Sequence, residues 1–493
     1  MRRVVAVALC LTSLAVTGAA QGAAVGSVPR YEPVPCPGRV AADEKIECGR
    51  LVVPENRAKP GGRTIGVPVV IFRSRAAHPK PDPVLFTSGG PGTSAAANAR
   101  SGRNISLLDE RDYVVLGQRG SKFGEPFLEC PEVAEARRAA LERGARVEDQ
   151  TAAEVAAARR CRDRLRASGV DLDGYTTAES AADIEDLRRA LGVERWNLYG
   201  ISYSVRIMLE VIRGYPGTVR SAVLDSALPP DVDYDEVGVT NVARSLDVLF
   251  GACAADPDCF EAYPDLRKQF YEVVRRANER PLPVEIERDG RRMVVPVGGP
   301  RFVALIADTL AVARAIPRAP RLIAETHAGR YAAIAPLVSE SFDNGFVWGL
   351  RYSVWCADEM PFADPAKVAR QSARDYPELG GYVSPAVWPG VCREWGVRAS
   401  GAREDTPVTS DVPVLVIAGE YDPATPPSWG RRAVRTLKNG RFVEVPGHGH
   451  TPSMMSTGPC VRQIVDAFVR DPSAAPDVTC LSGYGRPKFV PGT

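Results

Sequence analysis

The chain has 493 residues and a formal net charge of +2, with acidic and basic residues interspersed along its length. This charge balance excludes a strongly basic surface for nucleic acid, and the length allows one large core or two smaller ones. The chain carries no fixed-period repeat and no long biased tract. We therefore expect a folded protein that neither binds nucleic acid nor embeds in a membrane.

The first residues predict export. Arg2 and Arg3 precede the apolar run "VVAVALCLTSLAV" and the small residues "TGAAQGAA". This order is typical of a secretory signal peptide, and the run is too short to span a bilayer comfortably. We assign residues 1–24 to a signal peptide and expect a secreted protein, in the medium or associated with the cell wall.

Cysteine usage agrees with export. Removal of the signal peptide removes Cys10 and leaves ten cysteines, an even number that an oxidising compartment favours as disulfides. They fall into neighbouring pairs along the sequence: Cys36 and Cys48, Cys130 and Cys161, Cys253 and Cys259, Cys356 and Cys392, and Cys460 and Cys480. Neighbour pairing is the simplest connectivity, although spacing does not determine it. A metal site is disfavoured, because the chain has no CxxC motif and only four histidines.

Strand-like and helix-like segments alternate from about residue 66 to 230. The expected strands are "PVVIF", "PVLFTSG", "DYVVLGQRG", "RWNLYG" and "VRSAVLD". The expected helices lie around 151–168, in "SAADIEDLRRALG" with Ser180 as its cap, and after Ser202. This alternation predicts helices that cover a largely parallel sheet.

The alternation stops between residues 231 and 400. Helical spacing dominates there, and "PVEIERDGRRMVVPV" indicates a hairpin that turns at Asp289 and Gly290. Strands "VPVLVIAG" and "GRFVEVPG" and helices "PSWGRRAVRTL" and "CVRQIVDAFVRD" then resume the pattern. We predict one α/β domain, formed by residues 25–230 and 401–493, with a mostly helical lid inserted over 231–400.

The segment "WNLYGISYS" favours a nucleophile. Ser202 follows a predicted strand and precedes a predicted helix, so its hydroxyl would be exposed beside the amides of the helix N-terminus. Such a turn needs small residues two positions before and after the serine. Gly200 meets this need fully and Ser204 only in size, so the motif alone also fits an ordinary helix cap.

A serine nucleophile needs a histidine base and an acid that orients it, in the chain order serine, acid, histidine for a sheet of this kind. Asp422 follows the strand "VPVLVIAG" and His450 follows the strand "RFVEVPG". We choose His450 because the glycines of "GHGH" deliver it beyond the turn, and His448 is the alternative. Asp225, after "VRSAVL", is the alternative acid.

An oxyanion hole is the remaining requirement. In "LFTSGGPGTSA", Gly89 and Gly90 follow an early strand and expose backbone N–H groups, and Pro91 fixes the loop. An ordinary Gly-Pro turn is the alternative. With serine, acid and histidine in order, we interpret the segment as a donor loop.

Together these motifs resemble a known family. "SGGPG", "GQRGSKFGEPFLEC", "GISYS", "AGEYDPATPP", "PGHGHT" and the cysteine-bearing "CAADPDC", "WCADEMPF" and "CREW" are similar to the secreted α/β-hydrolases of the tripeptidyl aminopeptidase and proline iminopeptidase family. The resemblance covers most of the mature chain and implies an α/β-hydrolase fold with the triad Ser202, Asp422 and His450. It also implies an oxyanion hole from the amides of Gly90 and Tyr203, and cleavage of short peptide units from free N-termini.

Three positions depart from the family pattern. Ser88 stands where His or Asn-Pro often precedes "GGPG", Gly117 replaces the aspartate of "DQRG", and Ser204 replaces the last glycine of "GxSYG". None belongs to the predicted triad. We expect Gly117 to loosen the loop support and Ser204 to tilt the turn, which affects efficiency and substrate choice more than reaction class.

The free amine of a peptide is a cation, so a carboxylate buried under the lid would anchor it. The resemblance at "CADE" directs this role to Asp358 and Glu359, which Cys356 could pin through a disulfide. A solvated acidic pair near a helix is the alternative.

The predicted function is that of a secreted serine exopeptidase that releases short peptides, foremost tripeptides, or single residues through an acyl-enzyme. This chemistry requires no metal and no organic cofactor. Peptide or protein N-termini would be its substrates, and a monomer is favoured. Two alternatives remain: a secreted carboxylesterase with the same triad, and a catalytically inactive hydrolase fold that binds a ligand or partner.

Overall fold

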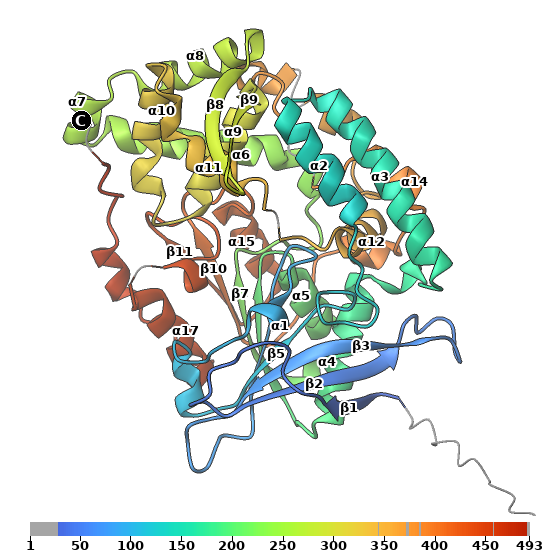
Figure 1. Ribbon diagram of the computed structural model, residues 1–493. Helices are drawn as coiled ribbons and strands as arrows, with labels where there is room; N and C mark the ends of the chain where they lie inside the picture. Colours follow the sequence, from blue (N-terminus) through green and yellow to red (C-terminus); the bar gives the residue numbers. More distant parts are fainter. Residues whose placement is uncertain (1–27, 344, 371–373, 384–385, 457, 491–493) are drawn as a thin grey trace, which may run out of the picture.

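A computed structural model describes residues 28–490 of the chain, apart from residues 344, 371–373, 384–385 and 457. The predicted signal peptide, residues 1–24, lies outside the described residues. Figure 1 shows a large sheet in the lower half of the molecule and an assembly of helices above it.

The sheet contains the predicted parallel strands and an antiparallel edge. Its strands are β1 (Arg30–Pro33), β2 (Ile46–Pro54), β3 (Thr64–Phe72), β4 (Val84–Thr87), β5 (Tyr113–Leu116), β6 (Trp196–Ile201), β7 (Val219–Asp225), β10 (Val414–Gly419) and β11 (Gly440–Val445). Their order is β1-β2-β3-β5-β4-β6-β7-β10-β11. The six strands from β5 to β11 in this order run parallel, and β1, β2 and β3 form the antiparallel edge.

The winding of the chain reverses at β4, which lies between β5 and β6. In open α/β sheets the crevice at such a point, beyond the carboxyl ends of the strands, is where ligands bind. The loop after β4 and the turn after β6 meet there, and these carry the predicted donor loop and the predicted nucleophile.

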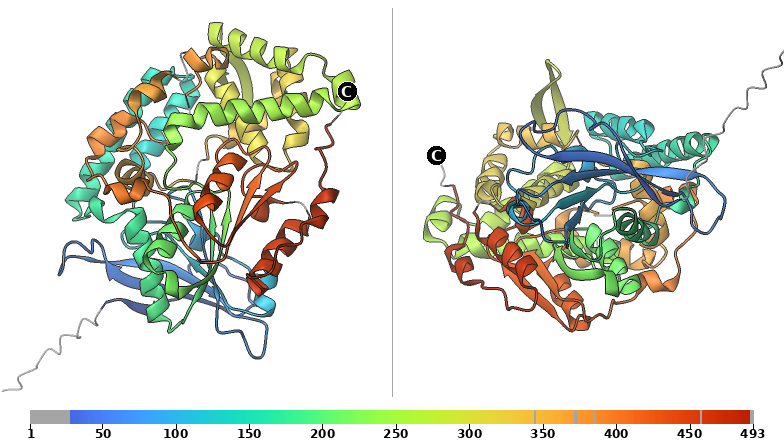
Figure 2. Two further views of the ribbon diagram at one scale, coloured as in Figure 1. Left: turned by 180° about the vertical axis from the view of Figure 1, so that it is seen from behind. Right: turned by 90° about the horizontal axis from the view of Figure 1, so that it is seen from below.

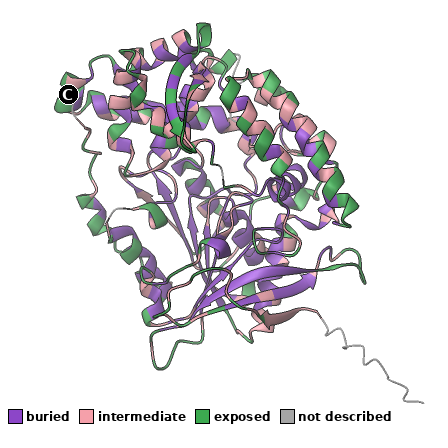
Figure 3. Cartoon of the chain, viewed as in Figure 1, coloured by how far each residue is buried: buried purple, intermediate pink, exposed green. Residues whose placement is uncertain are grey.

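Helices cover both faces of the sheet, so its central strands are apolar along their length. In β10, Val414 and Val416 pack into the core on one face, and Leu415 and Ile417 into the core on the other. The first face is covered by α4 (Thr177–Ala190), α5 (Ser204–Gly214) and α15 (Pro427–Ala433), and the second by α1 (Ala95–Asn98) and α17 (Cys460–Arg470). Figure 3 shows these strands as the buried centre of the lower half.

The helix α4 begins earlier than predicted. Thr176 is its cap, because the Thr176 hydroxyl accepts the N–H of Glu179 at 3.2 Å. The predicted cap, Ser180, lies inside the helix and is buried. Several hydroxyl residues in "YTTAES" suit a cap, and the sequence pattern does not distinguish them.

Between β7 and β10 the chain forms a second assembly with its own apolar core. Its helices are α6 (Tyr234–Ala254), α7 (Pro257–Ala262), α8 (Leu266–Glu279), α9 (Gly299–Ala311), α10 (Ala319–His327), α11 (Ala335–Glu340), α12 (Trp348–Asp358), α13 (Pro365–Arg370) and α14 (Pro389–Trp395). Of these, α12 and α14 pack into the core on the first face of the sheet instead. The hairpin of β8 (Leu282–Arg288) and β9 (Arg291–Val297) is confirmed. Its turn has positive φ at Asp289 and Gly290, 52° and 72°.

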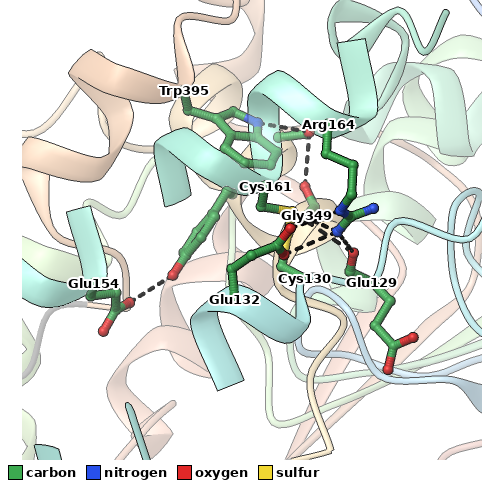
Figure 4. Close-up of a disulfide and its surroundings, with 10 residues drawn as sticks. Glu129, Cys130, Glu132, Glu154, Cys161, Arg164, Gly349 and Trp395 are labelled. Atoms are coloured by element: carbon green, nitrogen blue, oxygen red, sulfur yellow. Dashed lines mark hydrogen bonds and ion pairs between the residues drawn. A yellow bond between two sulfur atoms is a disulfide. The ribbon is translucent and has the colours of Figure 1, made fainter. Parts of the chain in front are cut away.

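Two helices from the N-terminal part pack beside this assembly. They are α2 (Pro131–Arg143), which was not predicted, and α3 (Val147–Ala167). The view from behind in Figure 2 shows them next to α12 and α14, away from the sheet. Figure 4 shows the Cys130–Cys161 disulfide that ties α3 to the start of α2, with Glu154 of α3 nearby. The Glu154 carboxylate accepts the Tyr352 hydroxyl of α12 at 2.7 Å.

The predicted disulfides are confirmed, and each joins neighbours in the sequence. The pairs are Cys36–Cys48, Cys130–Cys161, Cys253–Cys259, Cys356–Cys392 and Cys460–Cys480. This usage fits a protein of an oxidising compartment. Within the described ranges, no helix combines the length and apolarity needed to cross a bilayer.

Candidate active site

Ser202 lies at the turn between β6 and α5. Its φ of 56° falls in the left-handed region that non-glycine residues seldom adopt, as in the strained turn that presents a nucleophile. Gly200 permits this turn, because a Cβ there would lie 2.7 Å from Cγ of Met208. Ser202 is partly exposed, and its hydroxyl has no hydrogen-bond partner among the described residues.

Ser204 braces the turn instead of tilting it. Its hydroxyl accepts the N–H of Ile201 at 2.8 Å and lies 2.9 Å from the carbonyl oxygens of Thr87 and Ile201. These contacts join the end of β4 to the end of β6. The serine therefore supplies hydrogen bonds that a glycine at this position would lack.

The structure brings Asp422 and His450 together. Nδ1 of His450 lies 2.7 Å from Oδ2 of Asp422, so Nδ1–H donates to the carboxylate and Nε2 is left as an acceptor. The carboxylate is fully buried and also accepts the N–H groups of Ala424 and Thr425, at 2.8 and 2.9 Å, and the Thr425 hydroxyl, at 2.8 Å. These bonds fix both the acid and the imidazole ring.

Electrostatics favour an imidazole that gains a proton easily. Burial acts to lower the pKa of His450, but the carboxylates of Asp422 and Asp225 outweigh it and raise the pKa above the ordinary value. Burial likewise acts to raise the pKa of Asp422, but His450 and Thr425 hold that pKa below its ordinary value. The pair is thus an ionised acid beside a basic imidazole.

The two alternatives from the sequence form other hydrogen bonds. His448 hydrogen-bonds through Nδ1 to the carbonyl of Pro446, at 2.8 Å, and through Nε2 to Ser456, at 3.2 Å. The carboxylate of Asp225 accepts the N–H and the hydroxyl of Ser453. Asp225 therefore acts on His450 through its charge, without a hydrogen bond to the ring.

Backbone bonds bring the nucleophile turn and the histidine loop to one edge of the sheet. The N–H of Ser202 donates to the carbonyl of Asp225 at 2.9 Å, and the N–H of Thr451 donates to the Ser226 hydroxyl at 2.7 Å. In the described chain no hydrogen bond joins the Ser202 hydroxyl to the His450 ring. Such catalytic bonds are often long without substrate and tighten when it binds.

Glycines allow the histidine loop to fit between the sheet and the inserted assembly. A Cβ on Gly419, at the end of β10, would lie 1.9 Å from the carbonyl oxygen of Gly449. A Cβ on Gly449 would lie 2.2 Å from the carbonyl oxygen of Leu310, on α9. The N–H of His450 donates to the carbonyl of Ala311 at 2.7 Å, so the C-terminal end of α9 contacts this loop.

The predicted donor loop lies directly against the nucleophile. A Cβ on Gly89 would lie 2.7 Å from Cβ of Ser202. Gly90 has a φ of 113°, which glycine tolerates. Across the part of the chain that the structure describes, the N–H groups of Gly90 and Tyr203 have no acceptor within hydrogen-bond distance. Both are therefore available to a ligand.

The loop is well supported although Gly117 replaces the family's aspartate. A side chain at Gly117 would meet Cγ of Pro68 at 2.6 Å, so an aspartate does not fit without a shift. Gln118 supplies the support: its Nε2 donates to the carbonyl oxygens of Ser88 and Gly89, at 2.6 and 2.8 Å. The Ser88 hydroxyl lies 2.6 Å from the hydroxyl of Thr93. The expected loosening is not seen.

Asp358 and Glu359 are buried and already paired. The oxygens of Asp358 accept the Thr177 N–H at 2.7 Å and the Ser400 hydroxyl at 2.5 Å. Glu359 accepts Nη1 of Arg206 and the N–H of Tyr234, both at 2.5 Å. All four carboxylate oxygens thus accept protein donors, which argues against the predicted anchoring of a substrate amine. Their long-range partners left no signal in the local sequence.

One group of possible metal ligands does not include any residue of this site. Among the described residues, Cys130, Glu132 and Cys161 have side-chain ligand atoms within 4.8 Å of one another. The two sulfur atoms form a disulfide, so no thiolate is available as a ligand.

Two family models match the chain. The model for the alpha/beta hydrolase fold matches residues 82–260, and the model for TAP-like protein matches residues 380–480. Serine protease Hip1 of Mycobacterium tuberculosis is 24% identical over 455 residues, which cover 86% of this chain and 84% of that protein. The tripeptidyl aminopeptidase of Streptomyces coelicolor is 23% identical over 88% of this chain and 83% of its own length. A Streptomyces coelicolor protein named "Probable proline iminopeptidase" is 39% identical over 31% of this chain and 35% of its own length.

The sheet order and these matches make the chain a serine hydrolase of the α/β-hydrolase fold. Within that class, the predicted resemblance to the tripeptidyl aminopeptidase and proline iminopeptidase family is confirmed by the relatives that carry those names.

The bracing by Ser204 predicts a loss of stability when its hydroxyl is removed. S204A leaves the partly buried N–H of Ile201 without its partner, so we expect the free energy of unfolding to fall by about 1–3 kcal/mol. Denaturant unfolding of the two proteins measures the difference. S482A, at an exposed serine whose hydroxyl donates to the carbonyl of Thr479, is the control, and equal stability of S204A and wild type would contradict the bracing.

Proposed function

We propose that the protein is a secreted serine exopeptidase in which Ser202, Asp422 and His450 form the catalytic triad. The observation that carries the proposal is the buried Asp422–His450 pair at the sheet edge that also presents an unpartnered serine hydroxyl. The free amides of Gly90 and Tyr203 are the proposed oxyanion hole. The names of the relatives support a peptidase over other serine hydrolases.

In the proposed reaction, Oγ of Ser202 attacks the carbonyl carbon of the scissile peptide bond while Nε2 of His450 takes the hydroxyl proton. The imidazolium then donates this proton to the leaving amine, and the peptide C–N bond breaks. Water attacks the acyl-enzyme, with His450 again as base, and releases the N-terminal fragment. Asp422 holds the ring through Nδ1–H and stabilises the imidazolium in both steps.

An unpaired acid in the inserted assembly supports a substrate with a free amine. Asp308, on α9, lies one helical turn before Ala311, whose carbonyl accepts the N–H of His450. The residue has an exposed surface, yet burial raises its pKa to about 6. Asp308 is thus reached by solvent, although nearby protein disfavours its charged form. Among the described residues, the carboxylate forms no hydrogen bond or ion pair, and Arg301 attracts it only at longer range.

A substrate ammonium group would pair this carboxylate, because an enclosed charge without a partner favours a ligand of opposite charge. We therefore transfer to Asp308 the anchoring role that the sequence directed to Asp358 and Glu359. A lone acid in the apolar helix "PRFVALIADTLA" is the signal that could have identified it. An esterase would have no use for this carboxylate.

The proposed setting is extracellular. The five disulfides support folding in an oxidising compartment, to which the predicted signal peptide would direct the chain. The names of two relatives support tripeptides or single residues, proline among them, as the units released. Peptide or protein N-termini are then the substrates.

The first prediction from the proposed function concerns the nucleophile. S202A should lower kcat on tripeptidyl amide and single-prolyl amide reporters with free N-termini by about 10³–10⁶-fold, because no other group can form the acyl-enzyme. Wild-type protein should cleave acetylated reporters poorly, and the better free-amine reporter gives the length of the unit. Steady-state rates of the mature protein are the measurement, with S482A as control. Ester turnover without peptide cleavage would make the protein a carboxylesterase, and failure to react with a fluorophosphonate would make it a binding protein.

The second prediction concerns the amine anchor. D308N keeps the size of the side chain and removes its charge, so KM for free-amine reporters should rise about 10- to 100-fold. KM for acetylated reporters and short acyl esters should stay unchanged. D247N, at an exposed acid on α6, is the matched control. An equal rise in KM for both kinds of reporter would remove Asp308 from amine recognition.

The third prediction concerns pH. His450 accepts a proton from Ser202 only in its neutral form, and its pKa is raised. The rate constant kcat/KM should therefore rise with pH through a midpoint above 6.5. D422N removes the carboxylate that raises this pKa, so the midpoint should move to lower pH while kcat falls by about 10³–10⁴-fold. A midpoint that D422N leaves unchanged would assign the titration to another group.

A further inference from the structure

Helix α12 contacts the walls of the proposed oxyanion hole at both of its ends. Val347, directly before the helix, donates its N–H to the carbonyl of Gly92 at 2.9 Å, and a Cβ on Gly92 would lie 2.9 Å from the Val347 carbonyl oxygen. At the other end, Asp358 accepts the N–H of Thr177, the first residue of α4, and Glu359 accepts Nη1 of Arg206, on α5. A helix from the inserted assembly is thus part of the site's frame.

The donor loop is held on both sides of Gly90. The carbonyl oxygen of Gly89 accepts Nε2 of Gln118 and the Thr93 hydroxyl, both at 2.8 Å. Because the peptide is planar, fixing this oxygen also fixes the direction of the Gly90 N–H on the opposite side. The next carbonyl, that of Gly90 itself, accepts Nη1 of Arg351 at 2.9 Å. Arg351 is the contribution of α12 to this loop.

Arg351 is itself held firmly. It is 9% exposed, and its guanidinium lies 4.5 Å from the ring centroid of Phe346 and 5.4 Å from that of Trp355. Its Nε donates to the carbonyl of Ala386 at 3.2 Å. Among the described residues it has no ion pair. A buried cation without a carboxylate partner is costly for stability alone, so the fold retains it for its position beside the loop.

The second donor is held from the other end of α12. The Tyr203 hydroxyl lies 2.9 Å from the Thr177 hydroxyl, and the N–H of Thr177 donates to Asp358 at 2.7 Å. One turn further along α5, Arg206 pairs with Glu359. The acid pair therefore fixes the first turn of the helix that carries the Tyr203 amide.

The helix α12 is anchored to its surroundings. Its Tyr352 hydroxyl donates to Glu154 of α3, and Ser353 accepts the indole N–H of Trp395, on α14, at 3.0 Å. Figure 4 shows Glu154, Trp395 and Gly349 around the Cys130–Cys161 disulfide. The disulfide between Cys356 and Cys392 joins α12 to α14 covalently. The helix is thus a fixed support.

We propose that α12 braces the oxyanion hole and that Arg351 is a positioning residue, which sets the Gly90 amide for the transition state. This inference rests on the proposed triad and oxyanion hole. Preorganised donors matter most when the oxyanion forms, so a misplaced Gly90 amide weakens the transition state more than the bound substrate. Arg351 therefore acts on kcat and leaves KM nearly unchanged.

The test uses R351M, which keeps an apolar stem between the two aromatic rings and removes the donor, and R351K, which keeps a charge and one donor. Loss of a complete oxyanion donor lowers kcat by about 10²–10³-fold, so we expect R351M to lower kcat by about 10–100-fold, with KM within about twofold. R351K should restore part of the rate. R267M is the matched control, since Arg267 lies 4.8 Å from the Phe250 ring centroid in the same assembly, without contact to the loop.

Two readouts separate positioning from damage to the fold. Complete reaction with a fluorophosphonate counts the intact sites, so kcat is expressed per intact site. A peptidyl boronate, which forms a tetrahedral adduct with the serine, should bind R351M more weakly by the same factor as kcat/KM falls, while product inhibition stays the same. If R351M kept the wild-type kcat per site and the wild-type affinity for the boronate, the inference would be overturned. Activity that survives S202A would instead overturn the proposed function beneath it.

Discussion

Close backbone contacts that only glycine allows hold the site together. Gly89 lies against Ser202, Gly419 against the histidine loop, and Gly449 against the end of α9, each where a Cβ would lie within 2.7 Å of another atom. The carbonyl and amide groups of different chain segments can therefore bond directly across the carboxyl edge of the sheet. A side chain at any of these glycines would push two backbone segments apart. The positions of the Asp422–His450 pair, the donor loop and the inserted assembly therefore depend on the glycines.

The inserted assembly contacts the site through two helices, α9 and α12. Through α9 it supplies the Ala311 carbonyl that accepts the N–H of His450 in the histidine loop, and it carries the proposed amine anchor Asp308. Through α12 it contacts the donor loop and the first turn of α5. A lid would be expected to cover a site that is complete without it. Here the contacts of the assembly hold the loops of the site in place, so the assembly is part of the site. The two helices belong to different apolar cores, α9 to the core of the assembly and α12 to a core that it shares with one face of the sheet.

Much of the fold was predictable because its signals are local. Helices cover both faces of the sheet, so strands such as β10 are continuous apolar runs, and the loops after them carried the acid and the histidine in the expected order. The cap of α4 and the helix α2 were missed because polar helices and neighbouring hydroxyls give ambiguous patterns. The pairing of Glu359 with Arg206, 153 positions away, was not predictable, since local spacing carries no information on such contacts. The contact between Arg351 and Gly90 was not predictable for the same reason.

The central claim is that Ser202 carries the N-terminal part of a peptide as an acyl group. The most direct measurement is the intact mass of the mature protein after rapid acid quenching of a reaction with a free-amine peptide ester, since protonation of His450 stops deacylation. The account predicts an added mass equal to one short N-terminal unit, located by peptide mapping to Ser202, and this mass gives the number of residues released. An unchanged mass under turnover, or an adduct on another residue, would contradict it.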